Sequence, residues 1–320
     1  MTDQDLQQLR SEKWRLDGKP IRTIEEARAF VETVGFCLMY PVRPTMPVPT
    51  FIGAFVGSDN RLPTWQHAYS DPRALAATEL MVRLLRERAA YEANLFNENN
   101  AFLVAASVFP YFYALVGERN PKLAPKQGPR SPYSPLACDA FELIRRDGPI
   151  SKPKLQEALG GSVSLAALDK ALGELLAKLR ITRVDYKPSE GSFWDLLYRW
   201  APDAVREGVG LSVQEALSAL LSKYLDCVIA AEQSELETFF GNFVARSRVK
   251  DGDGHGGNKD REVCAERADQ EEHHEDRLYV GPLPDVAKPF DKTPGSRRGA
   301  SAAMKFLHAQ RAQRAEHRQK

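Results

Sequence analysis

The amino-acid sequence predicts a mainly α-helical protein with small β-ribbons, and three observations lead to this fold class. Ser, Thr or Asp repeatedly precedes apolar residues at helical spacing, which is the pattern of capped amphipathic helices. Prolines and glycines divide those helices into short pieces. In the middle of the chain, three such helices are followed by two runs of strand length on either side of a turn.

Composition and charge exclude several classes of protein. The 320 residues contain 44 Lys+Arg and 43 Asp+Glu, a formal net charge of +1, which fits neither a basic nucleic-acid coat nor an acidic solvating chain. The 43% share of apolar residues is enough for a hydrophobic core. Four widely separated cysteines without a C-x-x-C pair argue against a disulfide scaffold or a zinc finger. They favour a reducing, cytoplasmic location.

The first stretch of the chain, residues 1–130, is predicted to be a helical domain. Thr23 and Glu26 form a capping box that opens an amphipathic helix. Residues 38–55 contain four prolines, too many for a helix interior, so extended segments and turns are expected there. Asp71-Pro72 then supplies the N-cap and first residue of another helix. A proline-rich linker ends this stretch.

The most apolar run, residues 101–116, is shorter than the roughly 20 apolar residues that a membrane-spanning helix needs. Pro110 lies in its middle, so a buried strand or a helix pair broken at that proline is expected. The segment 1–15 is polar and charged and has no signal-peptide pattern. We therefore expect a soluble protein with no membrane partner.

The second stretch, residues 131–208, is the most informative. A short helix ends at Asp147-Gly148-Pro149, Ser151 opens a second helix, and Ser164 opens a third with a leucine-rich face. A strand over 181–186, a turn and a second strand-length run over 193–200 follow. Three short helices followed by a two-stranded ribbon is the order of a winged helix-turn-helix domain.

The chain continues with the start of a further helical unit over residues 209–250, which a capping box at Ser212 and Glu215 opens. Residues 251–320 form a tail of low predicted order that ends in basic residues, because it is rich in glycine and charge and poor in large apolar residues. Two interpretations of this tail stay open. It is either a basic extension that adds phosphate affinity or a frameshift-like extension that cuts a helical pattern short.

Basic side chains of the winged helix are the candidates for DNA contact. Lysine suits phosphate contact, which positions a protein without reading sequence. The third helix has no Arg, Asn or Gln to read base edges, so sequence-specific recognition is weakly supported. The alternative is that these side chains are the solvated face of a protein scaffold. The candidates are Lys152, Lys154, Lys170, Lys178, Arg183 and Lys187.

Other polar clusters predict no metal or cofactor site. The group Cys264, Glu271, His273 and His274 matches no zinc-ligand spacing, so no metal is expected. The sequence lacks the G-x-S-x-G, P-loop, G-x-G-x-x-G and H-E-x-x-H motifs, so neither a nucleotide nor another cofactor is expected. The cluster at residues 65–67, Trp-Gln-His, is interpreted as a structural turn.

The winged helix and its flanking segments resemble a known family. The segments that carry the resemblance are Asp147-Gly148-Pro149-Ile150, residues 168–181, the run Phe193–Asp203 and the small-residue segment Ala105–Pro110. Their order and spacing, over residues 24–250, are similar to the winged-helix DNA glycosylases of the AlkZ/YcaQ type. The resemblance implies tandem winged helix-turn-helix units, with residues 1–130 as a winged-helix-like domain, that grip duplex DNA.

The resemblance also implies hydrolysis of the N-glycosidic bond of alkylated or crosslinked purines. The family orients the attacking water with a Gln-x-Gln or Gln-x-Asp pair after its first capped helix. The matching position here is Gly35-Phe36-Cys37, where neither Gly35 nor Cys37 can do this. Glu32 is the nearby carboxylate that could substitute, since capping already accounts for Glu26.

Three functions are thus compatible with the sequence. The first is a DNA glycosylase-like winged-helix protein that binds duplex DNA and excises damaged purines. The second is a non-catalytic DNA-binding or scaffold protein on the same fold, which the missing pair favours. The third is a transcriptional regulator, which the poor base-reading helix disfavours.

Overall fold

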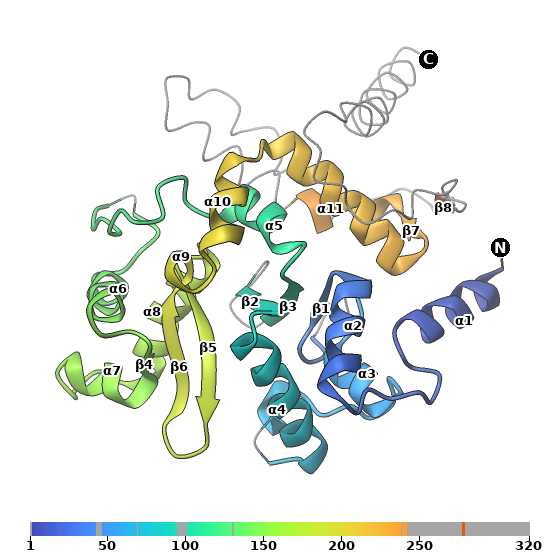
Figure 1. The fold of residues 1–320 in the computed structure, drawn as a ribbon, viewed down its shortest axis with the longest axis horizontal. Helices are drawn as coiled ribbons and strands as arrows, with labels where there is room; N and C mark the ends of the chain where they lie inside the picture. The colour runs from blue at the N-terminus through green and yellow to red at the C-terminus, as the bar shows by residue number, and fades with distance from the viewer. Residues whose placement is uncertain are drawn as a thin grey trace, which may run out of the picture.

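The structure, a computed structural model, describes residues 2–42, 47–68, 70–94, 101–129, 131–237, 239–241 and 277–278. Within these ranges the protein is mainly helical with small antiparallel sheets (Figure 1), so the prediction of a mainly α fold with small β-ribbons is confirmed. No helix in these ranges is both long enough and apolar enough to cross a membrane.

Residues 24–105 form a unit that we call the first repeat. Its first helix, α2 (Ile24–Val34), opens with the expected capping box: the Thr23 hydroxyl accepts from the Glu26 N–H, and the Glu26 carboxylate accepts from the Thr23 N–H. The remaining elements follow in the order β1 (Phe36–Leu38), α3 (Phe51–Val56), the 3-10 helix η1 (Trp65–His67), α4 (Pro72–Arg86), β2 (Ala90–Asn94) and β3 (Ala101–Ala105). Strand β3 lies between β1 and β2 and is antiparallel to both.

Residues 135–196 form the second repeat. Helix α8 is capped as expected, because the Ser164 hydroxyl accepts from the Ala167 N–H. The elements follow in the order α6 (Pro135–Asp147), β4 (Ile150–Ser151), α7 (Lys152–Ala158), α8 (Leu165–Ala177), β5 (Ile181–Lys187) and β6 (Gly191–Leu196). Strand β6 lies between β4 and β5 and is antiparallel to both.

The two repeats have the same topology. Each runs helix, short strand, helix, helix, strand, strand, and in each the last strand occupies the middle of the sheet. Helices α4 and α8 therefore hold equivalent positions, as do the hairpins β2–β3 and β5–β6. The repeats lie side by side, with α4 and β2 of the first against β5 of the second (Figure 1).

Four further helices connect and cover the repeats: α5 (Phe109–Val116), α9 (Leu197–Trp200), α10 (Pro202–Gly210) and α11 (Val213–Val228). Helices α10 and α11 both pack on α5, and all three continue the core of the first repeat. Phe36 lies at the centre of this core, with its ring 5.2 Å from that of Phe112 and 5.7 Å from that of Phe239. The second repeat has a separate apolar cluster.

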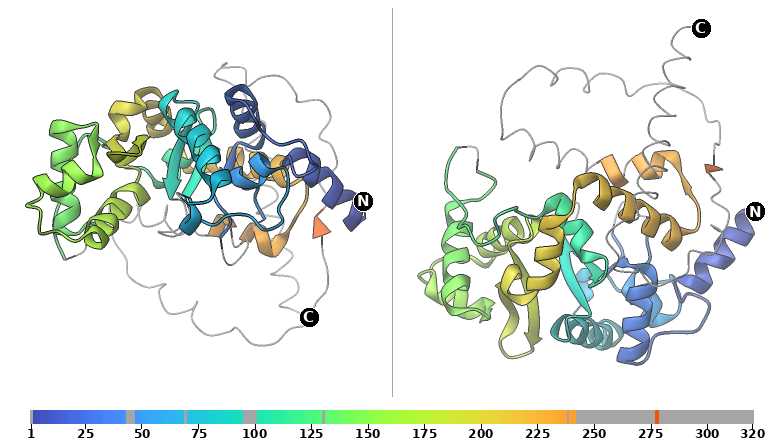
Figure 2. Two further views of the ribbon diagram at one scale, coloured as in Figure 1. Left: turned by 90° about the horizontal axis from the view of Figure 1, so that it is seen from below. Right: turned by 45° about the horizontal axis from the view of Figure 1, so that its top comes forward.

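Helix α1 (Asp3–Lys13) lies at the end of the molecule away from the second repeat (Figures 1 and 2). It buries none of its residues, and polar contacts attach it to the end of α11. The Arg10 guanidinium donates to the carbonyls of Val228 (2.8 Å) and Ala230 (2.6 Å), and the Trp14 indole donates to the carbonyl of Cys227 (3.0 Å). These donors satisfy carbonyls at and just beyond the helix end that lack intrahelical partners.

After α11, strand β7 (Ala231–Glu232) pairs antiparallel with β8 (Arg277–Leu278), and residues 233–237 and 239–241 are helical. The expected capping box of Ser212 and Glu215 is present at the start of α11. Apart from β8, the predicted low-order tail lies outside the described residues.

Three local predictions differ from the structure. The run over 193–200 is not one strand, because the chain turns into α9 at Leu197. The proline-rich segment 38–55 contains a short helix, α3, whose N-cap Thr50 accepts from the Gly53 N–H. The apolar run 101–116 divides into strand β3 and helix α5, with Pro110 in the first turn of α5, where its missing N–H costs no helical hydrogen bond.

Candidate nucleic-acid interface

Gly35, the first half of the position matched to the family's catalytic pair, ends helix α2. It adopts a φ of 78°, which glycine accepts without strain. Its N–H donates to the carbonyl of Val31, and its own carbonyl accepts from the Ala105 N–H, both at 2.8 Å. A side chain here would start 2.5 Å from the Lys223 Cε atom. This position therefore holds a turn.

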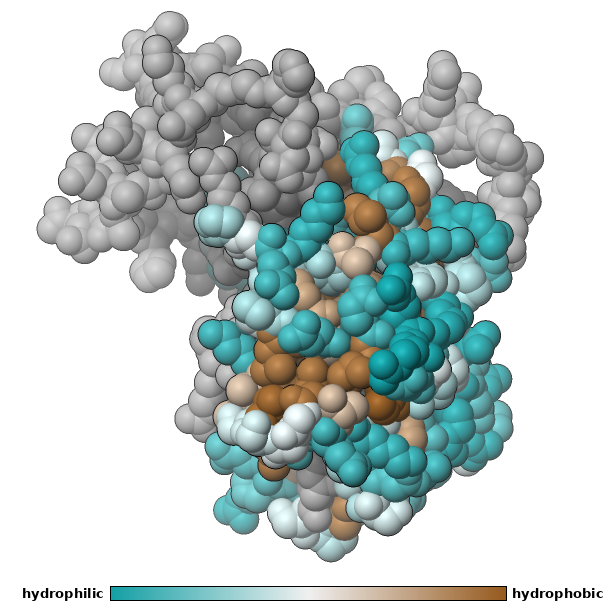
Figure 3. Space-filling model, turned by 90° about the vertical axis from the view of Figure 1, so that its left-hand side faces the viewer, coloured by the Kyte–Doolittle hydropathy of each residue, from teal (hydrophilic) through white to brown (hydrophobic). Residues whose placement is uncertain are grey.

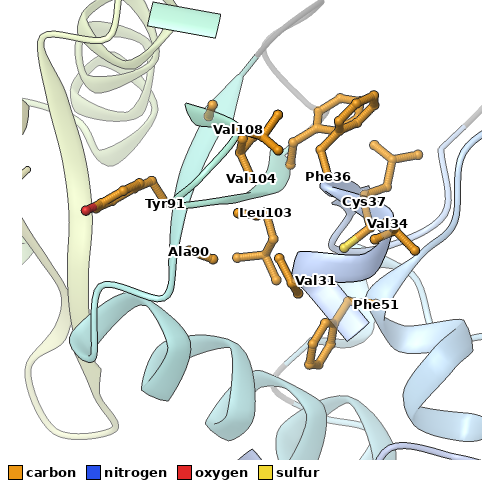
Figure 4. Close-up of a cluster of buried hydrophobic side chains, with 14 of the residues drawn as sticks. Val31, Val34, Phe36, Cys37, Phe51, Ala90, Tyr91, Leu103, Val104 and Val108 are labelled. Atoms are coloured by element: carbon orange, nitrogen blue, oxygen red, sulfur yellow. The ribbon is translucent and has the colours of Figure 1, made fainter. Parts of the chain in front are cut away.

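Cys37, the second half, lies in the core. All three residues of β1 are buried, and Figure 4 shows the Cys37 sulfur among apolar side chains near Val31 and Val34. Burial raises the pKa of the Cys37 thiol well above its ordinary value, so the group stays protonated at neutral pH. A protonated thiol that water does not reach cannot activate water.

The two nearby carboxylates lie on α2. Glu26 accepts from the backbone N–H groups of Arg22 (2.7 Å) and Thr23 (3.1 Å), and these hydrogen bonds lower its pKa. Glu26 is thus occupied by the capping box. Glu32 is exposed on the same helix, so its carboxylate meets solvent.

Three of the predicted DNA-contacting lysines pair with carboxylates of the second repeat. The ammonium of Lys152 lies 2.5 Å from Asp169 of α8. Those of Lys154 and Lys187 lie 3.8 Å and 3.2 Å from the same residue, Glu190, in the turn between β5 and β6. We call Lys152, Lys154 and Lys187 the lysine cluster. The carboxylates offset part of its charge, but exposed pairs of this kind are weak and can exchange for phosphate.

The other three predicted contacts are placed differently. Lys170 is exposed on α8, and Lys178 is half-buried at the C-cap of that helix. Arg183 is not at the surface: its side chain is 4% exposed, and its Nε atom donates to the Glu92 carboxylate at 2.6 Å. The prediction that Arg183 contacts DNA is therefore corrected, because a buried, paired guanidinium cannot reach a phosphate in this conformation.

An apolar patch lies on the outer face of the second repeat (Figure 3). Leu165 at the start of α8 is 54% exposed, and several other apolar side chains of this repeat are partly exposed. The start of α8 therefore presents carbon rather than hydrogen-bonding groups. That this helix reads few base edges stays a prediction.

The contact between the repeats contains polar groups that the sequence did not single out. We call this contact, between α4 and β2 on one side and β5 on the other, the seam. The Glu92 and Arg183 side chains form an ion pair there with exposures of 5% and 4%. At the surface of the seam, Arg86 pairs with Asp185 at 2.5 Å.

Trp65 lies beside the seam and is 47% exposed. Its ring meets that of Tyr40 edge to face at 5.6 Å, and the Arg183 guanidinium carbon lies 5.7 Å from its centroid. The sequence interpretation of residues 65–67 as a structural turn is correct for the backbone, which forms η1. It missed the exposed indole, and the only signal for it was an aromatic residue within a polar turn.

The described residues contain no group of three His, Cys, Asp or Glu side chains that could hold a metal ion. The cluster around His273 and His274 lies outside the described residues.

Comparison with known proteins gives one weak structural match. No protein family model matches the chain, and no curated protein matches its sequence. Among solved structures, the chain is similar to Streptomyces sahachiroi DNA glycosylase AlkZ, with a TM-score of 0.42 and 12% sequence identity. The match covers 76% of this chain and 65% of that chain, so this chain spans just under two thirds of its length. The relationship is a distant structural one and assigns no activity.

Proposed function

We propose that this protein binds duplex DNA as a tandem winged helix-turn-helix protein. The observation that carries the proposal is the repeated order of helix, strand, two helices and hairpin, with the last strand in the middle of each sheet. In winged helices the third helix and the hairpin face DNA. Here these elements are α4 with β2–β3 and α8 with β5–β6.

The proposed contact surface on the second repeat is the lysine cluster with Lys170. Lys154 and Lys187 have side chains 68% and 51% exposed, and both reach Glu190 at the hairpin turn. Lysines in this position suit the sequence-independent phosphate contacts that position a protein on a duplex. The apolar start of α8 adds no base-reading group, so binding is expected to be largely independent of sequence.

Neutralising the lysine cluster is expected to weaken DNA binding. In the Lys152→Gln/Lys154→Gln/Lys187→Gln variant, affinity for a duplex should fall roughly tenfold at low salt, and the slope of log affinity against log salt should drop by about 3, since each phosphate contact contributes about 0.9. Fluorescence anisotropy with a labelled duplex over a salt series measures both quantities.

The matched control is Lys19→Gln/Lys122→Gln/Lys126→Gln, which removes three charges from exposed lysines elsewhere. It should bind with nearly the wild-type slope. Equal slopes for the two triple variants would show that the lysine cluster does not contact phosphate. Absence of duplex binding by the wild type at low salt would reject the proposal and leave a protein scaffold.

A DNA-binding protein of this kind could also be an enzyme that excises alkylated or crosslinked purines. Turn geometry at Gly35 and burial of Cys37 leave no water-orienting group at the family's position, and exposed Glu32 is the one nearby substitute. We propose that DNA binding proceeds without excision at this position.

Accordingly, purine release from alkylated duplex DNA should not exceed the no-protein control, and the Glu32→Gln variant should behave like the wild type. Mass spectrometry of the freed bases is the measurement. Release that Glu32→Gln abolishes while duplex affinity is unchanged would instead identify an active glycosylase.

We further propose that α11 and β7 begin a third unit of the same kind. The order of helix, strand and helical residues repeats there, and β7 pairs antiparallel with a later strand, as β1 and β4 do. The predicted domain boundaries at 130 and 250 fall on residues outside the described ranges and stay predictions. The predicted boundary at 208 falls within α10, which is one continuous helix.

A further inference from the structure

Trp65 differs from the other aromatic side chains of the described residues, which are all buried or only partly exposed. A tryptophan with 47% of its surface in solvent gives up much of the stabilisation that burial would provide. Single exposed apolar residues are common, so exposure alone assigns no role. Two further features distinguish this one: the ring contacts two buried side chains, Tyr40 and Arg183, and it lies at a defined place in the repeat.

The indole is held by contacts on its backbone and its ring. In η1 the Thr64 carbonyl accepts from the His67 N–H, and the two side chains hydrogen-bond to each other, both at 2.9 Å. Tyr40, which meets the ring edge to face, is itself fixed by a 2.7 Å hydrogen bond between its hydroxyl and that of Thr78. These contacts restrict the motion of the ring, which lowers the conformational entropy that binding on it would cost.

Arg183 contacts the same ring without acting as a free charge. The Glu92 carboxylate pairs with its guanidinium in the buried part of the seam. The pair holds the guanidinium against the indole and offsets its charge locally. The exposed surface is thus aromatic and close to neutral, which suits a planar base better than a phosphate.

The position of Trp65 relates this surface to DNA. It lies in the connection between α3 and α4. In the proposed winged helix of the first repeat, this connection is the turn of the helix-turn-helix. If α4 faces DNA as proposed above, the indole lies next to the duplex at the seam. An extruded base is the DNA group with an aromatic face to offer there.

We propose that Trp65 is a stacking platform for an unpaired base of bound DNA. This inference rests on the proposed function and adds a preference for duplexes with an unpaired nucleotide. Base–aromatic stacking tolerates any base, because each base has a π-face. The site should therefore recognise the unpaired state rather than a particular sequence.

The test compares a paired duplex with the same duplex carrying one bulged adenine. The full-length wild type should bind the bulged duplex about tenfold more tightly. Trp65→Leu should reduce this preference to within about twofold, and Trp65→Phe should keep most of it, because stacking needs an aromatic ring. The wild-type-minus-Trp65→Phe difference in tryptophan emission should be quenched by the bulged duplex.

Leu9→Ala is the control, since Leu9 is also exposed, at 43%, but lies on α1 away from the seam (Figure 1). It should keep the full preference. Far-UV circular dichroism and thermal melting establish that each variant is folded.

The outcomes separate this inference from the proposed function. Equal affinity of the wild type for the two duplexes, or an unchanged preference in Trp65→Leu, overturns the platform while DNA binding stands. Quenching of Trp65 by a single-stranded oligonucleotide without any duplex binding would support the platform and reject the duplex proposal. No binding to either nucleic acid rejects both.

Discussion

Replacing Cys37 with glutamine, the residue type of the resembled family's catalytic pair, is expected to destabilise the protein by about 4 kcal/mol and to create no glycosylase activity. The Cys37 side chain is fully buried in β1, opposite Leu103 of β3. Glutamine is larger than cysteine, and its amide would enter an apolar core without hydrogen-bond partners. Overpacking and unsatisfied polar burial both oppose the change.

Urea denaturation followed by circular dichroism measures this loss. Cys37→Ser tests polarity at nearly constant volume and should cost less than Cys37→Gln, because it adds no bulk. Glu32→Gln, on the exposed face of α2, should stay within about 0.5 kcal/mol of the wild type. A folded Cys37→Gln variant with wild-type stability would contradict the burial of this position, and purine release by it would restore the family's mechanism.

Removing one partner of the Glu92–Arg183 pair is expected to cost about 3–5 kcal/mol, because the remaining charge is left buried without compensation. The variants are Glu92→Leu and Arg183→Met. The double variant should be much closer to the wild type than either single variant, since apolar side chains of similar size often replace a buried ion pair at little cost. The free energy of unfolding from urea titrations gives the full double-mutant cycle.

The exposed pair on the same seam provides the control. Arg86 and Asp185 have side chains 55% and 23% exposed, so Arg86→Gln should cost no more than about 1 kcal/mol. Additive effects of Glu92→Leu and Arg183→Met would show that the two side chains do not interact. The pair joins the two repeats. If either single variant unfolds in two separate transitions, the pair is needed for the two repeats to unfold together.

Much of the helical structure follows from sequence alone because its determinants are local. The capping boxes at Thr23–Glu26 and Ser212–Glu215 join residues three positions apart, and both are present. Asp71 and Ser164 likewise open the helices expected of them. In each case the hydrogen bonds that begin the helix need no partner from a distant part of the chain.

The contacts between residues far apart in the sequence were decided by the tertiary structure alone. Arg183 is a basic residue of the type that contacts DNA, but its partner Glu92 is 91 residues away in the sequence. Only the packing of the two repeats brings the two side chains together. The sequence also did not show that the two sheets have the same topology, because this depends on which strand occupies the middle of each sheet. The change from strand β6 to helix α9 at Leu197 could likewise not be predicted, because the pattern of apolar and polar residues does not change there.

The candidate site also has features that the sequence predicted and features that only the fold decided. Sequence alone was enough to place Lys152 and Lys154 at a helix start and Lys187 at a hairpin turn, because both are local features. It also determined that residues 35–37 lack a water-orienting pair. Burial of Cys37, pairing of Arg183 and exposure of Trp65 were decided by the fold, since solvent access depends on what every other element covers.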